Sequence, residues 1–153
     1  MWKLEISNIG GIHEATPVIE PGINAVQASN WQGKTSLVTA IRTILGGSVD
    51  TTTLTDGVDS GTVRLQIGDK EYERHLKRTG RTITTEGTPY LQETPKQTAA
   101  ELFAFLDEQN PIRTAVRERQ DLTPHLIEPL EQENIEGQIK QLKSERANVK
   151  SEL

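Results

Sequence analysis

The order of apolar and polar residues in the first third of the chain predicts short strands separated by turns. Apolar and polar side chains alternate from Trp2 to Ile6, which is the period of a strand with one buried face. Asn8 and the pair Gly10-Gly11 follow this run and predict its end. Two more apolar runs lie on either side of the turn pair Pro21-Gly22 and predict strands at 17–19 and 23–27.

A helical period follows residue 33. Four apolar residues recur at positions i, i+3, i+4 and i+7, and these are Leu37, Ala40, Ile41 and Ile44. They predict one apolar face of a helix, and the pair Gly46-Gly47 predicts its C-terminal end.

The middle of the chain returns to strand-like runs before a second helix begins. The runs are 62–67, 72–76 and 82–85, and Gly68-Asp69 between the first two is typical of a two-residue hairpin turn. Thr94 is then a predicted N-cap, followed by Pro95 at the first helical position. The apolar face of this helix is expected to contain Ala99, Leu102, Phe103 and Leu106.

The last apolar positions are spaced by 4, 3, 7 and 4 residues, and they are Ile135, Ile139, Leu142, Val149 and Leu153. This is a heptad repeat in which Arg146 occupies the one missing core position. Residues 131–153 are therefore predicted to begin a coiled coil, with an ordinary surface helix as the alternative. Because the repeat reaches the last residue without a capping signal, we expect the coiled coil to continue in a longer protein.

Composition narrows the class of protein. The length of 153 residues fits one compact domain or one lobe of a larger one. No apolar run is long enough to span a membrane, and the first residues lack the apolar segment of a secretory signal. The absence of cysteine excludes disulfides and thiolate metal sites and favours an intracellular protein. The 22 acidic residues outnumber the 17 basic ones, which disfavours a protein that binds nucleic acid mainly by electrostatic attraction. A local basic face is still compatible with this composition.

The strongest chemical signal is a phosphate-binding motif at residues 28–35. They read Ala-Ser-Asn-Trp-Gln-Gly-Lys-Thr and fit the P-loop (Walker A) pattern, with Ala28 in place of the first glycine. Gly33 lets the backbone pass close to a phosphate, and the amides from Asn30 to Thr35 can form a nest for anionic oxygens. Lys34 would reach the β- and γ-phosphates, and the Thr35 hydroxyl would bind Mg²⁺.

The motif lies between a predicted strand and a predicted amphipathic helix, which is the context that a P-loop requires. The motif therefore predicts a nucleoside triphosphate and Mg²⁺ as ligands. The predicted nucleotide-binding residues are Asn30, Trp31, Gln32, Gly33, Lys34, Thr35 and Ser36.

At these residues the sequence resembles a known family. Residues 24–41, Asn-Ala-Val-Gln-Ala-Ser-Asn-Trp-Gln-Gly-Lys-Thr-Ser-Leu-Val-Thr-Ala-Ile, look like the start of an SMC-type ATPase. These coiled-coil ATPases of the ABC class include chromosome-organising proteins, the ATPase of the double-strand-break-repair nuclease complex and archaeal SMC-related proteins. The order of predicted elements fits along the whole chain, whereas only residues 22–45 are specific in sequence.

The resemblance implies a fold and a set of domains. The fold class is α/β, namely the lobe of a P-loop ABC-type head, with a mixed β-sheet and helices. Residues 1–130 would form the N-terminal lobe of the head, with the P-loop, a β-rich insertion and a Q-loop. Residues 131–153 would form the root of an antiparallel coiled coil.

The resemblance also implies that the nucleotide is ATP, and it implies catalytic residues. Family members carry a glutamine before the coiled coil that contacts Mg²⁺ and the attacking water, and Gln120 lies where this Q-loop is expected. Lys34 and Gln120 are thus the predicted catalytic residues, and Thr35 and Gln120 the predicted Mg²⁺ ligands. A plain surface glutamine is the alternative at position 120, and Gln109 and Gln132 are rival candidates. Many relatives have an arginine in the loop after the first strand, but residues 8–13 contain none.

Hydrolysis in the family needs further motifs that are missing here. There is no Ser-Gly-Gly signature, and the apolar stretch before Asp107-Glu108 belongs to a capped helical pattern rather than to a strand. The chain therefore resembles the N-terminal half of a head, completed by a C-terminal half and by a second head in a homodimer that sandwiches two ATP molecules. It would hydrolyse ATP only when so completed.

The family also implies a role in DNA repair or chromosome organisation, in the cytoplasm and associated with the nucleoid. Expected partners are DNA and a nuclease or kleisin, but no membrane. Arg74, Lys77, Arg78 and Arg81 cluster with His75 around a predicted β-turn, and Arg113, Arg117 and Arg119 would share one face of a strand. Both groups are candidate DNA contacts, and protection of strand edges is the alternative explanation.

Two other classes of function compete with this one. A stand-alone P-loop kinase or GTPase is disfavoured because no Asn-Lys-x-Asp motif and no arginine-rich lid are present. A structural assembly module that uses nucleotide only for folding is the other alternative, and ATP turnover would distinguish it from an ATPase.

Overall fold

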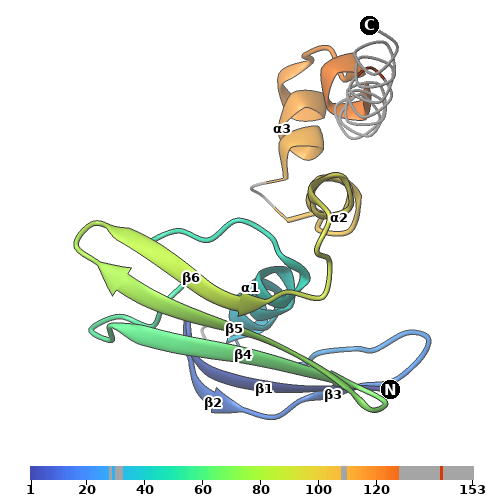
Figure 1. Ribbon diagram of the computed structural model, residues 1–153. Helices are drawn as coiled ribbons and strands as arrows, with labels where there is room; N and C mark the ends of the chain where they lie inside the picture. Colours follow the sequence, from blue (N-terminus) through green and yellow to red (C-terminus); the bar gives the residue numbers. More distant parts are fainter. Residues whose placement is uncertain (28, 30–32, 108–109, 128–141, 143–153) are drawn as a thin grey trace, which may run out of the picture. The chain divides into compact units, whose positions relative to one another are not determined.

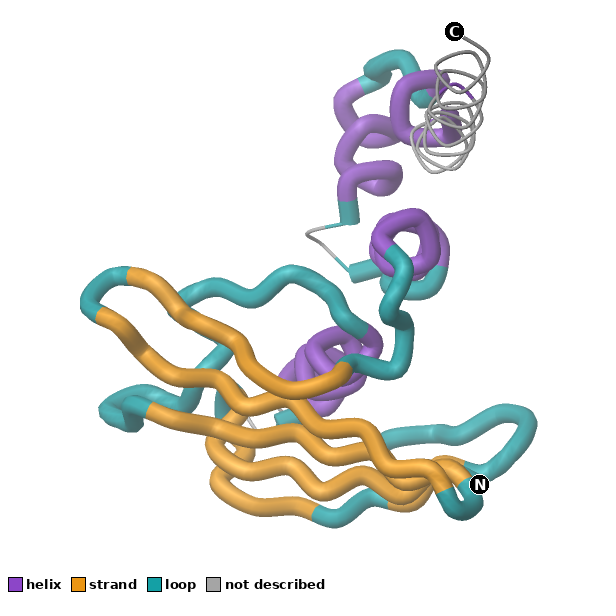
Figure 2. The backbone as a smooth tube through the Cα atoms, in the orientation of Figure 1, coloured by secondary structure: helices purple, strands orange, loops and turns teal. Residues whose placement is uncertain are grey.

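The computed structural model describes residues 1–27, 29, 33–107, 110–127 and 142 (Figures 1 and 2). The chain divides into two compact units, Met1–Gln92 and Glu93–Leu153, and each is described by itself. The predicted division at residue 130 stays a prediction. Among the helices that the structure describes, none combines the length and the apolar character needed to cross a bilayer.

The first unit is built on a six-stranded sheet with the order β2-β1-β4-β5-β6, in which β3 also pairs with β1. Within the described part of the chain, each strand pair is antiparallel. The strands are β1 (Trp2–Ile9), β2 (Ile12–Ala15), β3 (Val18–Ile19), β4 (Ser60–Ile67), β5 (Lys70–Thr79) and β6 (Thr82–Thr88). The strands expected from the apolar runs at 2–6, 17–19, 62–67, 72–76 and 82–85 are confirmed.

One helix covers one face of this sheet (Figures 1 and 2). Helix α1 (Lys34–Leu45) ends at Gly46, whose φ is 100°. This left-handed conformation favours glycine because glycine has no Cβ. The core is formed by apolar residues of β1, β4, β5 and α1 together with Leu54 from the segment before β4, and its members are Leu4, Ile6, Ile9, Ala40, Ile44, Leu54, Val63, Leu65 and Leu76. The expected helix, its buried face and its glycine stop are confirmed, and with them the α/β lobe.

Strand β2 was missed because Gly10-Gly11 was interpreted as the end of a strand. The pair is instead the turn of a hairpin, since Ile9 pairs with Ile12 directly across it. Gly10 has a φ of 52°, which a glycine adopts without strain.

The strand predicted at 23–27 is wrong. Residues 23–27 have no strand assignment and are exposed, with the Ile23 side chain fully accessible. The local backbone is held by a side chain instead, because Asn24 Nδ2 donates to the Glu20 carbonyl at 2.7 Å and Asn24 Oδ1 accepts from the Glu20 amide at 3.0 Å. These bonds close the turn at Pro21-Gly22 in place of a sheet ladder.

The second unit contains α2 (Thr94–Phe103) and α3 (Pro111–Glu118), and residues 123–127 are also helical. Helix α2 begins one residue earlier than expected, because its N-cap is Glu93 rather than Thr94. It also ends at Phe103, so the expected apolar face is partly wrong: Leu102 is buried, but Phe103 and Leu106 are exposed. Phe105 is buried in their place because the chain leaves the helix before it.

A single asparagine joins the two helices. Asn110 is 1% exposed, and its Nδ2 donates to the carbonyls of Leu102 at 2.9 Å and Phe105 at 2.7 Å. Its Oδ1 caps α3 by accepting from the Arg113 amide at 2.8 Å. The heptad repeat from Ile135 to Leu153 lies outside the described residues, apart from Leu142.

Candidate nucleotide-binding site

The P-loop meets α1 at Gly33, which is the N-cap of the helix. Gly33 has a φ of 81° and a ψ of 13°, a left-handed conformation that side chains rarely adopt. A Cβ at this position would lie 3.0 Å from Ile12 Cγ1 on β2. Both the backbone angle and the close neighbour therefore require glycine here, as the motif does.

The first turn of α1 can receive an anion. The Leu37 amide donates to the Gly33 carbonyl at 2.9 Å, which closes the first helical turn. The amides at the start of any helix have no acceptor within the helix itself. No acidic residue lies in this turn, and Lys34 and Thr35 are exposed. The amides of a first helical turn, the positive end of the helix and an adjacent lysine fit a phosphate group.

The side chain of Lys34 contacts Ser29. Lys34 Nζ donates to the carbonyl of Ser29 at 3.3 Å, five residues back in the chain. The ammonium group therefore lies near Ser29, a described residue at the beginning of the motif. A lysine at the start of the helix is where a P-loop requires one, because this lysine contacts the outer phosphates of a bound nucleotide.

The β1–β2 hairpin contacts this helix start from the side. The Gly11 amide donates to Ser36 Oγ at 2.8 Å, and Ile12 lies beside Gly33. The sequence analysis did not find this contact. Two adjacent glycines flanked by isoleucines after an alternating strand were the available signal, since such a pair is typical of a tight hairpin turn.

Comparison with known proteins identifies the family. A family model described as an AAA domain matches residues 3–153. The chain belongs to this AAA domain family.

The chain is also similar to SMC-like proteins of haloarchaea. It is 40% identical over 162 aligned residues to Smc-like protein Sph1 of Halobacterium salinarum, covering 100% of this chain and 26% of that protein. It is 33% identical over 150 residues to Smc-like protein Sph3 of Haloferax volcanii, covering 98% and 22%. The resemblance to SMC-type ATPases is thus confirmed, and the chain spans about a quarter of the length of these curated relatives.

Several predicted site residues lie outside the described residues or in the second unit. Ala28 and the loop residues Asn30, Trp31 and Gln32 lie outside the described residues. Gln120 belongs to the second unit, where its Nε2 donates to Glu118 Oε2 at 2.8 Å and its amide donates to the Ala115 carbonyl at 2.8 Å. The rivals Gln109 and Gln132 are likewise outside the described residues. The predicted site therefore stays a prediction as a set.

A metal would have few protein ligands in this lobe. Among the described residues, no three His, Cys, Asp or Glu side chains are grouped as a metal centre requires. The exposed hydroxyl of Thr35 remains the candidate, which fits Mg²⁺ because this ion is held by few side chains together with substrate phosphates.

The residues before Glu108 do not form a strand in the described part of the chain. Phe103 is the last residue of α2, and residues 104–107 continue as turn and irregular backbone. The stretch is thus not a strand, as expected, but only Phe103 of it belongs to the expected helix.

The basic residues of β5 and of the turn that follows it differ in exposure. Arg74 is half-buried, and its Nη2 donates to Thr85 Oγ1 at 2.6 Å. Burial lowers the pKa of Arg74 below the ordinary value of a guanidinium. Arg78 Nε lies 3.9 Å from Asp59 and 3.5 Å from the Val58 carbonyl. Lys77 and Arg81, in contrast, are exposed.

The second basic group was expected on a strand, and that expectation is wrong. Arg113 and Arg117 lie four residues apart on α3, and Arg119 is its left-handed C-cap. Pro at the start of the helix and the Asn110 cap explain why this polar segment is helical. Arg113 and Arg117 therefore share a helix face, while Arg119 does not continue it.

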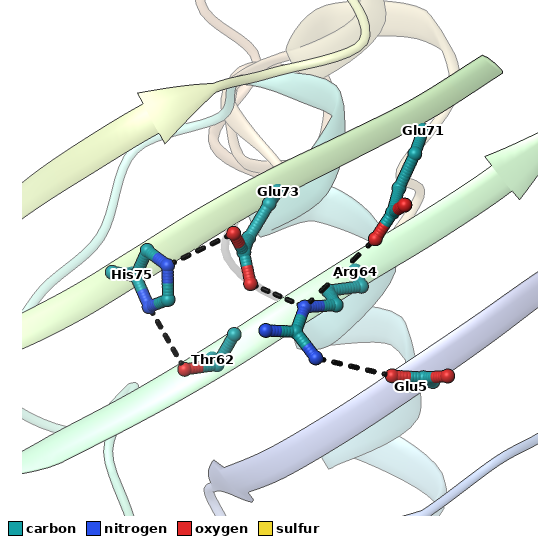
Figure 3. A network of polar contacts seen from close by, with 6 residues as sticks. All are labelled: Glu5, Thr62, Arg64, Glu71, Glu73 and His75. Carbon is teal, nitrogen blue, oxygen red and sulfur yellow. Dashed lines mark hydrogen bonds and ion pairs between the residues drawn. The ribbon is translucent and has the colours of Figure 1, made fainter.

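The face of the sheet opposite α1 carries a polar network (Figure 3). Arg64 forms ion pairs with three carboxylates, those of Glu5, Glu71 and Glu73. His75 Nε2 lies 3.0 Å from Glu73 Oε2. Burial raises the pKa of Glu73, but hydrogen bonds from Arg64 and His75 outweigh it and hold the pKa below its usual range. Because its charge is compensated within the sheet, Arg64 is not a candidate phosphate ligand.

Proposed function

We propose that this chain is the ATP-binding half of an SMC-like ATPase head. The observation that carries the proposal is the geometry at the start of α1, where left-handed Gly33 opens the helix and Lys34 reaches back to Ser29 at 3.3 Å. Membership of the AAA domain family and the similarity to SMC-like proteins support it.

The residues have distinct roles in this proposal. The amides before Leu37 bind phosphate oxygens, and Lys34 neutralises the β- and γ-phosphates. The Thr35 hydroxyl ligates Mg²⁺, as does Gln120. MgATP, when bound, supplies the phosphoryl group that is transferred to water. The Gln120 amide stays neutral at every working pH, so it can orient that water without a proton transfer of its own.

The lobe needs a second segment to work. Ile23 is fully exposed and Val26 is 57% exposed, directly before the P-loop. Apolar side chains in such a position favour burial against another part of the protein. We assign this part to the C-terminal half of the same head, which the greater length of the relatives allows. A second head then completes each ATP site, so the active unit is a homodimer.

The wider role follows from the same family. We place the complete protein in the cytoplasm with the nucleoid, in DNA repair or chromosome organisation, with DNA and a nuclease or kleisin as partners. Residues 131–153 begin its coiled coil. Exposed Lys77 and Arg81 support a contact with DNA phosphates, while Arg74 and Arg78 use their hydrogen bonds within the lobe.

Titration of the full chain with MgATP tests the nucleotide site. We expect weak but saturable binding that Lys34→Ala abolishes, because the lysine contacts the outer phosphates. Lys70→Ala is the matched control, since Lys70 is an exposed lysine beside the β4–β5 turn and should leave binding unchanged. Equal binding by both variants would exclude the P-loop as the site.

Turnover tests the need for completion. The chain alone should hydrolyse almost no ATP, and co-expression with the C-terminal half of a head should restore hydrolysis. Binding without turnover in the completed complex would favour the structural assembly module instead. Rapid hydrolysis by the chain alone that Asp107→Asn abolishes would overturn the requirement for a C-terminal half.

A further inference from the structure

The tip of the β1–β2 hairpin makes a direct backbone contact with the first turn of α1. The Gly11 amide donates to Ser36 Oγ at 2.8 Å, across 25 residues of sequence. Ser36 is the third residue of α1 and follows Lys34 and Thr35 in the same turn. The hydroxyl oxygen that accepts this bond therefore belongs to the part of the helix that receives phosphate.

The approach of the two segments is too close for any residue with a side chain. Gly10 has a φ of 52°, and a Cβ there would lie 2.5 Å from Ser36 Oγ and 3.0 Å from Ser36 Cβ. Two residues after Gly10, Ile12 makes the second close approach: its Cγ1 lies 3.0 Å from the position that a Cβ at Gly33 would occupy. The hairpin and the helix start thus touch at two points, and each point has a glycine on one side.

The hairpin is supported from its other side. The Gly10 amide donates to the Thr53 carbonyl at 2.8 Å, and the Thr55 amide donates to the Asn8 carbonyl at 3.1 Å. Leu54 between them is 1% exposed and forms a β-bridge with Ile9. Because the residues 53–55 are buried, the hairpin tip cannot move away from α1 without breaking core contacts.

We propose that the hairpin tip, Gly10 to Ile12, is a positioning element for the nucleotide site. It fixes the Ser36 hydroxyl through the Gly11 amide and fixes Gly33 through Ile12. Since Gly11 donates to the Ser36 oxygen, the hydroxyl proton of Ser36 is left to donate to a phosphate oxygen. The inference rests on the proposed function and adds to it an element that reaches the nucleotide only through the P-loop.

Two glycine variants separate positioning from simple strain. Gly10→Ala introduces a left-handed alanine and pushes on Ser36. Gly68→Ala introduces a left-handed alanine at a φ of 59°, where nothing lies within 4 Å of the new Cβ. Both variants place an alanine at a similar left-handed φ, whereas only Gly10→Ala brings a Cβ against Ser36, so a difference in nucleotide affinity between them is attributed to this contact.

The experiment measures the Kd for MgATP of the full chain at a temperature at which the wild type and both variants are folded by circular dichroism. We expect Gly10→Ala to weaken binding at least about tenfold, and Gly68→Ala to match the wild type, because small displacements of a binding group cost large factors. Equal Kd values for the two variants would overturn the inference and leave the proposed function intact. Failure of the wild type to bind would overturn both.

Amide hydrogen exchange gives a second readout that does not depend on the folding of Gly10→Ala. In the wild type, MgATP should slow exchange of the Gly11 amide, because a phosphate held by Ser36 stabilises the hydrogen bond. In Ser36→Ala the Gly11 amide should exchange faster than in the wild type even without nucleotide. A Gly11 amide that exchanges at the same rate in wild type and Ser36→Ala would contradict the proposed contact.

Discussion

The guanidinium of Arg74 donates from Nη1 to the backbone carbonyl of Thr43, 3.3 Å away. Thr43 lies in the last turn of α1, whose carbonyls carry the negative end of the helix dipole. A cation on β5 therefore stabilises the C-terminal end of the helix whose N-terminal end is the candidate phosphate site. The same guanidinium reaches Thr85 on β6, so one side chain joins the helix to two strands.

We expect Arg74→Met to lower the free energy of unfolding by about 2–3 kcal/mol, because it removes hydrogen bonds to half-buried acceptors. Urea denaturation of the full chain measures this loss. Lys77→Met is the matched control on the same strand, since Lys77 is exposed and should change stability by less than about 0.5 kcal/mol. Similar losses in both variants would exclude a special role for Arg74.

Asn110→Ala should destabilise the second unit. The substitution leaves three backbone carbonyls without their donor and removes the N-cap of α3. We expect a loss of about 2–4 kcal/mol in that unit, with faster exchange of the Arg113 amide. Arg117→Ala, an exposed position on α3, serves as the control. An unchanged exchange rate for Arg113 would contradict the capping role.

Asp50 should make stability depend on acidity. Hydrogen bonds from Thr52 and Thr53 outweigh partial burial and hold the pKa of Asp50 below its ordinary value of 3.8. A carboxyl with a lowered pKa in the folded state contributes stability above its ordinary pKa and loses it as the pH falls.

The wild type should therefore be more stable than Asp50→Asn at pH 7, by less than about 1 kcal/mol because Asp50 is exposed. This difference should shrink as the pH falls below 3.8. Urea denaturation of both proteins between pH 7 and pH 3 measures it. A difference that stays constant over this range would show that the carboxylate charge is not responsible.

DNA binding by the chain should depend on salt. If Lys77 and Arg81 contact phosphates, the double variant Lys77→Ala/Arg81→Ala should bind duplex DNA more weakly and lower the salt slope by about 2. The double variant Arg113→Ala/Arg117→Ala tests the face of α3 in the same way. Binding that does not change over a salt series would exclude a phosphate contact in either group.

The local parts of the fold could be predicted from the sequence, because neighbouring residues determine them. The spacing of Leu37, Ala40, Ile41 and Ile44 sets the buried face of α1, and Gly46 ends the helix by its own backbone preference. The β4–β5 hairpin follows in the same way from Gly68-Asp69 between two alternating runs. Gly33 and Lys34 could be predicted as P-loop residues in the same way, since the motif specifies a glycine and a lysine at these positions.

The remaining features depend on partners distant in sequence. An apolar run such as 23–27 becomes a strand only when another strand pairs with it, and the described lobe offers a side chain of Asn24 instead. Which of Phe103 and Phe105 is buried could be predicted only by knowing where α2 ends. The contact between Gly11 and Ser36 joins segments 25 residues apart, so no local pattern contains it.

Asn8 sets the position of the hairpin tip. Leu4 and Ile6 are buried at even positions and Ile9 at an odd one, and Asn8 between them has a φ of 57°. One left-handed residue thus shifts the inward face of β1 by one position. The number of residues from Leu4 to Gly10 consequently determines the direction in which the hairpin tip points. One inserted residue would turn the tip away from Ser36. An insertion at Gly68-Asp69 would only lengthen an exposed turn. The candidate nucleotide site should therefore be sensitive to the length of a strand whose apolar side chains face the core.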